Sequence, residues 1–436
     1  MLTRHRFAAV AGSLALATGL LTAPASAAVP PPRVLGYVAN NGSGDVSVVD
    51  TATDTVSTTI AGTSGTSPYD AAVAFDGARG YVTNSRDNSL SVLDTPTNTV
   101  DATVPVGAHP AGVTIAPDRG HVYVSNYDDG TVSVVDVATL STTATITVGD
   151  RPDGIDVAPD GKTLYVAHDV PGGGFVSVVD LATNALSVNV PTGLTPSALA
   201  ITPDGSKVVV VNKFSNSVAF LDTAVNTITA TIGVGAVPHG VAISPDGRFA
   251  YVTNSESDSV SVVDIAAGAV AATVPVGDRP IGVALTPDGA KAYVTNYAAG
   301  TTSVLDTASR TTTGTVGVGS QPVGVAVHTV PAAGTTITTG TARLQLRLLG
   351  FTVAGLTAKL VETHTGKLLA GERVSFTTTK GQTLCGATTD STGTARCDAN
   401  VSLLVGLATL LQGYTTGYAG TSAHRAAATH GSIRLL

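Results

Sequence analysis

A unit of about 42 residues recurs seven times along the chain, and this repeat limits the possible folds more than any other feature. One complete copy runs over residues 238–279, and a closely similar run begins at Pro280. An aspartate marks every copy, with successive spacings of 44, 42, 44, 42, 42 and 42 residues. The aspartates are Asp50, Asp94, Asp136, Asp180, Asp222, Asp264 and Asp306; in register with them recur a proline (Pro68, Pro110, Pro152, Pro196, Pro238, Pro280, Pro322) and an asparagine or histidine (Asn40, Asn84, Asn126, His168, Asn212, Asn254, Asn296).

Each unit has the pattern of four short strands. In the copy at 238–279, Pro245, Asp246 and Gly247 separate two apolar runs and predict a tight turn, because proline restricts φ and glycine tolerates positive φ. Two further runs rich in β-branched residues follow. One such sheet cannot bury its own apolar faces, so the copies must pack against one another. Radial repetition protects their edges, and the period therefore predicts an all-β fold with a seven-bladed β-propeller.

The two ends of the repeat indicate how the ring closes. The first copy begins at Val34 and lacks the innermost strand, whereas the last copy consists of that strand alone, at 324–327. We therefore expect a composite blade whose inner strand comes from the end of the array and whose outer three strands come from 34–60. An open ring would leave two unpaired edges, so this pairing should matter for stability.

The remaining segments differ in composition from the repeat. Residues 1–27 combine a basic start, an apolar run and Ala25-Ser26-Ala27, which predicts a cleaved signal peptide, and 28–33 form a proline-rich leader. We expect the propeller over 34–328, a linker over 329–340 and a β-sandwich over 341–436. No later segment is long and apolar enough for a membrane helix. The expected protein is secreted, either extracellular or associated with the cell envelope.

Both cysteines lie in the C-terminal segment. Cys385 and Cys397 flank a turn signal at 390–393, and in an exported protein this arrangement predicts a disulfide that staples a hairpin. The alternative, a metal pair or a reactive thiol, lacks nearby histidine partners.

The recurring tetrapeptide Tyr-Val-Thr-Asn resembles the motif of the YVTN family of β-propellers. It is intact at 81–84, 251–254 and 293–296, and near-copies begin at Tyr37, Tyr123, Tyr165 and Val209. The resemblance implies a fold more than an activity: such proteins are mostly exported or at the cell surface, and similar propellers occur in surface-layer proteins, in a periplasmic DNA-binding protein and in lactonase-like proteins. The segment 371–397 resembles bacterial immunoglobulin-like domains appended to surface proteins.

The candidate ligand-binding residues lie in the loops between the fourth and first strands and between the second and third strands, which should share one face of the disc. A ring of mixed charge and imidazole beside the recurring proline would suit a polar ligand such as a glycan or peptide. The alternative is that these are ordinary solvated loop residues. The candidates are Tyr69, Asp70, His109, Arg151, Asp153, His168, His239 and Arg279, and the same loops also supply Asp169, Lys213 and Glu256.

The recurring asparagine and aspartate are expected to be structural, because such side chains bond the backbone of their own turns and seven equivalent sites indicate architecture. His168 departs from the asparagine series beside a glycine-rich insertion at 171–174, and is the most distinctive single candidate.

Recognised catalytic and cofactor motifs are absent from the sequence, so we predict neither an enzyme nor a bound cofactor. A metal cluster of Asp70, Asp153 and His239, assembled across blades, is an alternative. The 23 basic and 31 acidic residues give a net charge of −8, and tryptophan is absent. Both facts disfavour nucleic acid, which needs a basic surface and stacking platforms. The expected partner is a glycan or protein of the cell envelope.

Together these features favour an exported, non-enzymatic binding protein that holds its ligand on the loop face of the propeller. Two alternatives stay open: a lactonase-like hydrolase that uses the mouth of the central channel, and a purely structural component of the envelope or surface layer. Ionisable side chains that converge in the channel would favour the hydrolase.

Overall fold

The computed structural model describes residues 33–62, 67–332, 335–340, 342–347, 350–363, 366–401, 412–421 and 424–435. The expected signal peptide at 1–27 and all of the leader except Arg33 lie outside these residues. The chain divides into two compact units, of which one spans 30–334 and the other begins at Thr335. β-Strands make up nearly all of the regular structure described, with one short 3-10 helix, η1 (Lys213–Ser215), which confirms the all-β prediction. None of the helices in the described part of the chain is long and apolar enough to cross a membrane.

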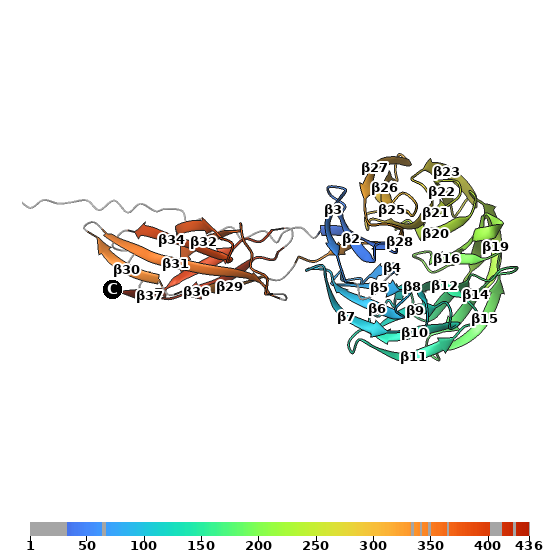
Figure 1. Ribbon diagram of the computed structural model, residues 1–436, viewed down its shortest axis with the longest axis horizontal. Helices are drawn as coiled ribbons and strands as arrows, with labels where there is room; N and C mark the ends of the chain where they lie inside the picture. Colours follow the sequence, from blue (N-terminus) through green and yellow to red (C-terminus); the bar gives the residue numbers. More distant parts are fainter. Residues whose placement is uncertain are drawn as a thin grey trace, which may run out of the picture. The chain divides into compact units, whose positions relative to one another are not determined.

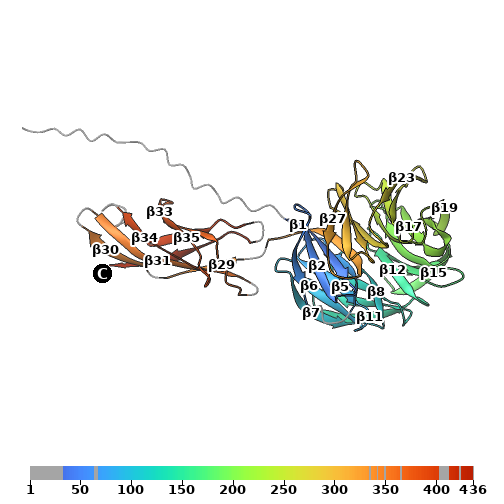
Figure 2. The same ribbon diagram turned by 45° about the horizontal axis from the view of Figure 1, so that its top comes forward.

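Seven four-stranded antiparallel sheets form the first unit, arranged in a ring as in a β-propeller (Figures 1 and 2). In six of them the strands follow one another in the chain, and the first strand lies nearest the centre of the ring (Figure 1). These sheets are β4 (Pro68–Val73), β5 (Arg79–Asn84), β6 (Ser89–Asp94) and β7 (Thr99–Pro105); β8 (Pro110–Ile115), β9 (His121–Asn126), β10 (Thr131–Asp136) and β11 (Ser141–Thr147); β12 (Pro152–Val157), β13 (Thr163–His168), β14 (Phe175–Asp180) and β15 (Ala185–Pro191); β16 (Pro196–Ile201), β17 (Lys207–Asn212), β18 (Ser217–Asp222) and β19 (Thr227–Gly233); β20 (Pro238–Ile243), β21 (Phe249–Asn254), β22 (Ser259–Asp264) and β23 (Ala269–Pro275); and β24 (Pro280–Leu285), β25 (Lys291–Asn296), β26 (Thr301–Asp306) and β27 (Thr311–Gly317).

The seventh sheet is composite, as predicted, and we call it the closing sheet. Its order is β28-β1-β2-β3, with β28 (Pro322–Val330) beside β1 (Arg33–Asn40), followed by β2 (Asp45–Asp50) and β3 (Thr55–Ile60). The antiparallel register joins Tyr37 to Ala326 and extends to the pair Arg33 and Val330. The inner strand is therefore longer than the expected 324–327. Residues almost 300 positions apart are joined by backbone hydrogen bonds, which removes the two free edges that an open ring would expose.

Burial explains why each repeat alternates between apolar and mixed strands. In β21 and β22 nearly every residue is buried, because the middle of each sheet is covered by neighbouring sheets on both faces. The outer strand β23 is mostly exposed. Gly247 has φ of 73° in the hairpin between β20 and β21, the left-handed region that the predicted turn requires.

The recurring aspartate closes the turn between the third and fourth strands. Asp136 Oδ1 accepts hydrogen bonds from the backbone N–H groups of Ala138 and Thr139, at 3.0 and 2.7 Å. Asp264 accepts one from Ala267 N–H in the same way. These bonds confirm the structural role expected for this position.

The threonine of the Tyr-Val-Thr-Asn motif joins neighbouring sheets. Thr295 Oγ1 donates to the carbonyl of Val323 at 2.6 Å and accepts from Gly282 N–H at 2.8 Å. Thr253 repeats the pattern with Ile281 O at 2.7 Å. Each such hydroxyl satisfies one buried carbonyl of the next inner strand and one N–H of its own, so it fixes the spacing between inner strands.

The asparagine of the motif is structural as expected, but its partners differ from those predicted. Asn254 Nδ2 donates to the hydroxyls of Ser259 and Ser261 on the third strand, at 3.1 and 3.0 Å. The expected bonds were to the backbone of its own turn. In the second sheet, Asn126 Oδ1 accepts from Gly107 N–H, in the connection that enters the inner strand.

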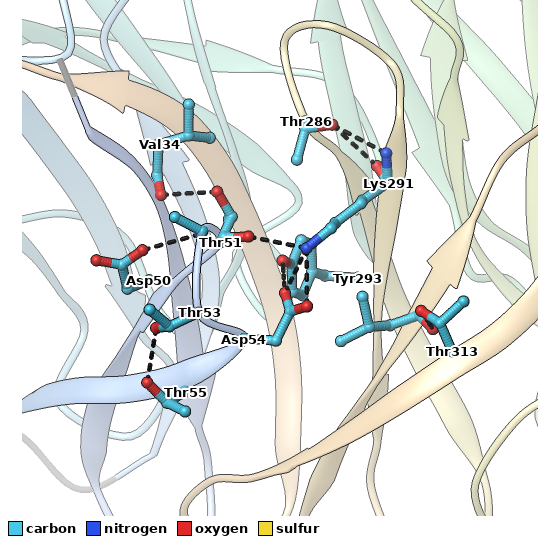
Figure 3. A network of polar contacts seen from close by, with 12 residues as sticks. Val34, Asp50, Thr51, Thr53, Asp54, Thr55, Thr286, Lys291, Tyr293 and Thr313 are labelled. Atoms are coloured by element: carbon cyan, nitrogen blue, oxygen red, sulfur yellow. Dashed lines mark hydrogen bonds and ion pairs between the residues drawn. The ribbon is translucent and has the colours of Figure 1, made fainter. Parts of the chain in front are cut away.

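A polar network joins the closing sheet to its neighbour (Figure 3). Lys291 Nζ donates to the carbonyl of Thr51 at 2.9 Å and to Asp54 Oδ2 at 2.7 Å, and the Tyr293 hydroxyl donates to Asp54 Oδ1 at 2.5 Å. Asp54 lies in the turn between β2 and β3, whereas Lys291 and Tyr293 lie on β25. The contact therefore ties the first outer turn of the array to its last complete sheet.

The second unit consists of two sheets that share one apolar core. The first has the order β29-β31-β30-β37, with β34 also paired to β31, and the second has the order β33-β32-β35-β36. Phe376, Leu356 and Tyr414 are among the fully buried side chains between them. The strands are β29 (Thr335–Thr339), β30 (Ala342–Arg347), β31 (Gly350–Glu362), β32 (Arg373–Thr378), β33 (Thr383–Thr388), β34 (Thr394–Val401), β35 (Tyr414–Tyr418), β36 (Ala427–Gly431) and β37 (Ile433–Leu435).

The disulfide between Cys385 and Cys397 is present, with Cα atoms 6.5 Å apart, but it does not staple a hairpin. Cys385 lies on β33, which pairs with β32, whereas Cys397 lies on β34, which pairs with β31 in the other sheet. The turn at 390–393 thus crosses from one sheet to the other, and the disulfide bridges the two layers. The expected linker at 329–340 is also corrected, because Thr329 belongs to β28 and β29 already begins at Thr335.

Candidate functional site

The residue after the recurring proline lines a central channel in the first unit. At the residue directly before each recurring proline, the backbone has positive φ in all seven copies, for example 52° at His109 and 53° at Arg279. This kink lets the chain leave the loop and descend into the inner strand. The channel residues at this position are Tyr69, Asp153, Ser197, His239, Ile281 and Val323, and the remaining copy has Ala111 at the equivalent place in the sequence.

In five of the seven copies the residue after this channel position is glycine, which keeps the channel narrow. A Cβ atom added at Gly282 would lie 2.3 Å from the carbonyl oxygen of Val323, and one at Gly240 would lie 2.4 Å from that of Ile281. The inner strands therefore touch through their backbones. The channel cavity measures about 100 Å³, and its lining includes Tyr69, Asp153 and His239.

Asp153 is the most unusual of these residues. It is 7% exposed, and among the described residues none donates a hydrogen bond to its carboxyl group. Burial, followed by the negative charge of Asp169, raises the pKa of Asp153 to about 8, although Lys213 opposes the shift. At neutral pH this carboxyl group is mostly protonated and can donate a hydrogen bond into the cavity.

Tyr69 and His239 complete the polar part of the channel. Burial, and then the positive charges of Lys213 and Arg279, lower the pKa of His239 to about 3, so its imidazole is neutral. The charge of Asp153 and burial raise the pKa of the Tyr69 hydroxyl well above its usual value. Within the described residues, neither side chain has a hydrogen-bond partner. A donor, a neutral acceptor and a protonated acid thus share one small cavity.

Asp70 lies in the same cavity but is already bonded. Its Oδ1 accepts from Ala71 N–H at 2.9 Å and its Oδ2 from Val113 N–H at 3.1 Å, so it bridges the inner strands β4 and β8. Burial nevertheless raises its pKa to about 6. Its first role is to hold two neighbouring sheets together.

A wider cavity of about 250 Å³ opens above the channel and shares Tyr69 and His239 with it; we call it the mouth cavity. Its charged lining consists of Lys213, Glu256 and Arg279. Arg279 lies over the ring of Tyr297, with its guanidinium carbon 5.5 Å from the ring centroid. Lys213 Nζ is 4.0 Å from Asp169 Oδ2, at the outer limit for an ion pair. Two cationic groups and one carboxylate therefore line the mouth, whereas the channel holds neutral polar groups.

The candidates His109 and Arg151 lie on the rim, away from the channel. His109 Nδ1 is 3.3 Å from Asp128 Oδ2, and the Arg151 guanidinium carbon lies 5.8 Å from the centroid of the Tyr127 ring. Arg151 also borders a separate cavity of about 440 Å³. The predicted ring is thus divided in two: Arg279, which also stands directly before a recurring proline, lines the mouth cavity, whereas Arg151 borders the separate cavity.

His168 requires a correction, because it does not face the loop surface. It is fully buried, with Nδ1 2.7 Å from the carbonyl oxygen of Asp150 and Nε2 2.8 Å from Ser177 Oγ. Its ring stacks on Phe175 at 4.2 Å, and burial lowers its pKa. His168 fills the place of the recurring asparagine, with both ring nitrogens satisfied.

The sequence interpretation missed Asp156, Tyr127 and Tyr297. Asp156 lies at the opposite end of the inner strands, in a cavity of about 450 Å³, and burial raises its pKa to about 6. It accepts from Ile201 N–H at 3.1 Å and so bridges two sheets as Asp70 does. Tyr127 and Tyr297 stand one residue after the recurring asparagine, as Lys213 does, and this shared register is the signal in the sequence; Tyr297 and Lys213 line the mouth cavity, whereas Tyr127 borders the separate cavity beside Arg151.

No group of three acidic, histidine or cysteine side chains in the described part of the chain is close enough to hold a metal ion. Asp70, Asp153 and His239 do line one cavity, but they do not converge on a point.

Comparison with known families decides the affiliation of the first unit. Residues 31–154 and 203–324, together more than half of the chain, match the family described as the cytochrome D1 heme domain. The chain belongs to the cytochrome D1 heme domain family. The gap in the match, 155–202, covers most of the sheet β12–β15 and the inner strand that follows it. No curated protein matches the chain.

Solved structures show the same fold at low identity. Hydrazine synthase of Kuenenia stuttgartiensis is 24% identical with a TM-score of 0.55, over 59% of this chain and 88% of the other. A protein of unknown function from Desulfotomaculum acetoxidans is 20% identical with a TM-score of 0.57, over 68% and 99%. A putative 6-phosphogluconolactonase from Bacteroides uniformis is 18% identical with a TM-score of 0.57, over the same shares. These likenesses establish the propeller fold.

The channel residues do not fit the haem that the family name implies. A haem needs a slot as wide as its macrocycle and an axial side chain free to reach the iron. The channel cavity of about 100 Å³ is closed by glycine contacts between inner strands, and the mouth cavity reaches only about 250 Å³. Both are below the roughly 300–1,000 Å³ of ordinary ligand pockets. His239, the histidine in the channel lining, lies among these close contacts.

Proposed function

We propose that this chain is an exported, non-enzymatic binding protein of the cell surface or extracellular space, whose ligand is held at the channel mouth of the first unit. In this proposal the seven sheets are the blades of a closed YVTN-type propeller. The second unit is an immunoglobulin-like sandwich that serves as a spacer or docking module.

One observation carries the proposal: Tyr69, Asp153 and His239 line a single cavity without hydrogen-bond partners among the described residues. Asp153 is buried and Tyr69 and His239 are half-buried, and withdrawing polar groups from water without a hydrogen-bond partner is unfavourable. The other blades place alanine, serine, isoleucine or valine at the same position, and the serine, Ser197, already donates a hydrogen bond to the carbonyl of His239. Polar groups that a fold does not need for itself are typical of a site that a ligand completes.

The disulfide supports an oxidising compartment, because thiols are kept reduced in the cytosol. It agrees with export, and the N-terminal segment expected to direct it lies outside the described residues. Retention at the envelope is part of the proposal and follows from the resemblance of the second unit to appended surface domains.

The test is a set of binding isotherms of residues 28–436 on isolated envelope and secreted-glycan fractions. Asp153→Asn combined with His239→Phe should abolish saturable binding, because both polar channel contacts are lost. Asp87→Asn is the matched control, since Asp87 is exposed on the loop face away from the channel. Binding that survives the double variant would refute the proposed site, and absence of binding to every fraction would refute the function.

A hydrolase is the second candidate, because a protonated Asp153 and a neutral His239 are a proton donor and acceptor in one cavity. In a lactone hydrolysis, His239 would take a proton from the attacking water and Asp153 would protonate the departing ring oxygen. Acid release from a panel of lactones, followed by pH-stat, tests this role. Turnover lost in Asp153→Asn and kept in Asp87→Asn would replace the non-enzymatic proposal.

A further inference from the structure

We infer that the channel mouth is a site for a small hydroxyl-bearing anion, with one carboxylate or phosphate group held by Lys213 and Arg279 and with hydroxyl groups held by Tyr69, Asp153 and His239. The inference rests on the proposed function and names the chemical class of its ligand. A sugar acid, free or at the end of an acidic glycan, is the simplest molecule of this kind.

Two cationic side chains define the anionic end of the site. Lys213 and Arg279 line the same mouth cavity, and the charges of both act on His239. Arg279 forms no ion pair with any described residue and rests on the Tyr297 ring, which orients its planar guanidinium group. Lys213, at 4.0 Å from Asp169, keeps donors for a further oxygen. A guanidinium and an ammonium group at one cavity are suited to bind an oxyanion.

The described residues that line the channel cavity include no lysine or arginine, so the interior of the site selects for hydroxyl groups. Asp153 is 93% buried and mostly protonated near neutral pH, so it offers a donor, while the neutral imidazole of His239 offers an acceptor. The channel cavity of about 100 Å³ has room for only a few water-sized groups. Hydroxyl groups satisfy such donors and acceptors without the desolvation cost of a second charge.

The tyrosine rings provide the remaining contact. Tyr69 and Tyr297 both line the mouth cavity, together with Ile281 and Val323. Aromatic and aliphatic surface of this kind packs against the C–H groups of a sugar ring, although the chain lacks tryptophan. Glu256 is exposed at the same rim and supplies a further acceptor for a hydroxyl group.

The experiment is isothermal titration of residues 28–436 with glucuronate, glucose 6-phosphate, glucose and glucosamine, at low and high salt. Glucuronate or glucose 6-phosphate should bind at least tenfold more tightly than glucose, and the two arms distinguish a carboxylate from a phosphate. Affinity should fall with salt. Lys213→Met and Arg279→Gln should each lower the affinity for the anion at least tenfold. Lys162→Met should leave this affinity unchanged, because Lys162 lies on an exposed turn at the opposite end of its sheet.

Two results would overturn the ligand class: equal affinity for glucose and for both anions, or tighter binding of glucosamine. Anion binding that persists in the combined Lys213→Met and Arg279→Gln variant would overturn the assigned residues. If none of the four sugars binds while the envelope fractions still bind in an Asp153-dependent manner, the ligand class fails and the proposed function stands. If neither binds, both fail.

Discussion

Thr295 and Thr302 provide a test of what the threonine of the repeat contributes to the fold. They face each other on the paired strands β25 and β26, and both are fully buried. Thr295 Oγ1 makes two short hydrogen bonds, to Val323 O and from Gly282 N–H, whereas Thr302 Oγ1 has no partner among the residues that the structure describes. The same substitution, threonine to valine, should therefore have opposite effects at two neighbouring positions.

Thr295→Val keeps the volume of the side chain but leaves the Val323 carbonyl and the Gly282 N–H group buried without this partner. At about 1–3 kcal/mol for each buried group, the free energy of unfolding should fall by about 2–4 kcal/mol. Thr302→Val removes an unsatisfied hydroxyl group and should stabilise the protein by about 1 kcal/mol. The other six copies carry valine or leucine at the position of Thr302, which shows that a branched apolar side chain fits there.

The assay is guanidinium denaturation of residues 28–436 followed by far-UV circular dichroism, since the chain has no tryptophan to report by fluorescence. Reduction of the disulfide shifts the transition of the second unit and so identifies that of the first. The midpoints should move in opposite directions with unchanged slopes. A neutral Thr295→Val, or a Thr302→Val that destabilises equally, would refute the reasoning that these hydroxyls join the inner strands.

Three further predictions follow from particular contacts. Lys291→Met should lower the free energy of unfolding by about 1 kcal/mol, a small effect because the ion pair with Asp54 is partly exposed. A double-mutant cycle with Asp54→Asn should show coupling between the two residues. A coupling energy of zero would mean that the contact in Figure 3 does not contribute to closure of the ring. Replacing Cys385 and Cys397 by serine should lower the free energy of unfolding of the second unit by about 3 kcal/mol and leave the unfolding transition of the first unit unchanged. A shift of both unfolding transitions would contradict the division into two units. The pKa of Asp153 is raised to about 8 in the folded state, so the folded protein holds a proton that the unfolded chain loses near pH 4, and the free energy of unfolding should fall as pH rises from about 4 to 8. In denaturation curves recorded at pH 5 and pH 8, Asp153→Asn should flatten this dependence. An unchanged pH profile would show that Asp153 ionises normally.

Much of the first unit is predictable from the sequence because its repeat encodes local and near-neighbour interactions. The Pro-Asp-Gly turn, the aspartate that closes the next turn and the alternation of buried and exposed strands all act within about 42 residues. Closure of the ring is also predictable, because the first copy lacks an inner strand and the last copy consists of an inner strand alone, so the two can pair to complete one sheet. The channel position of Tyr69, Asp153 and His239 follows from the proline beside each.

The tertiary structure decided what depends on burial and on partners from other copies. His168 and His239 are both histidines at recurring positions, but one is stacked on Phe175 with both nitrogens bonded and the other faces the cavity. The position of a cysteine in the sequence does not show whether a turn stays in its sheet or crosses to the next, so the disulfide was assigned to a hairpin when it joins two layers.

By itself, the sequence determined the period, the strand pattern and the way in which the ends meet, because each of these depends on residue types at regular spacing. Only the tertiary structure decided which side chains are left without partners and where charge gathers. Lys213 and Arg279 are 66 residues apart, in different sheets, and their convergence on one cavity depends on the curvature of the closed ring. The electrostatic character of the mouth is therefore a property of the closed ring and not of any one repeat.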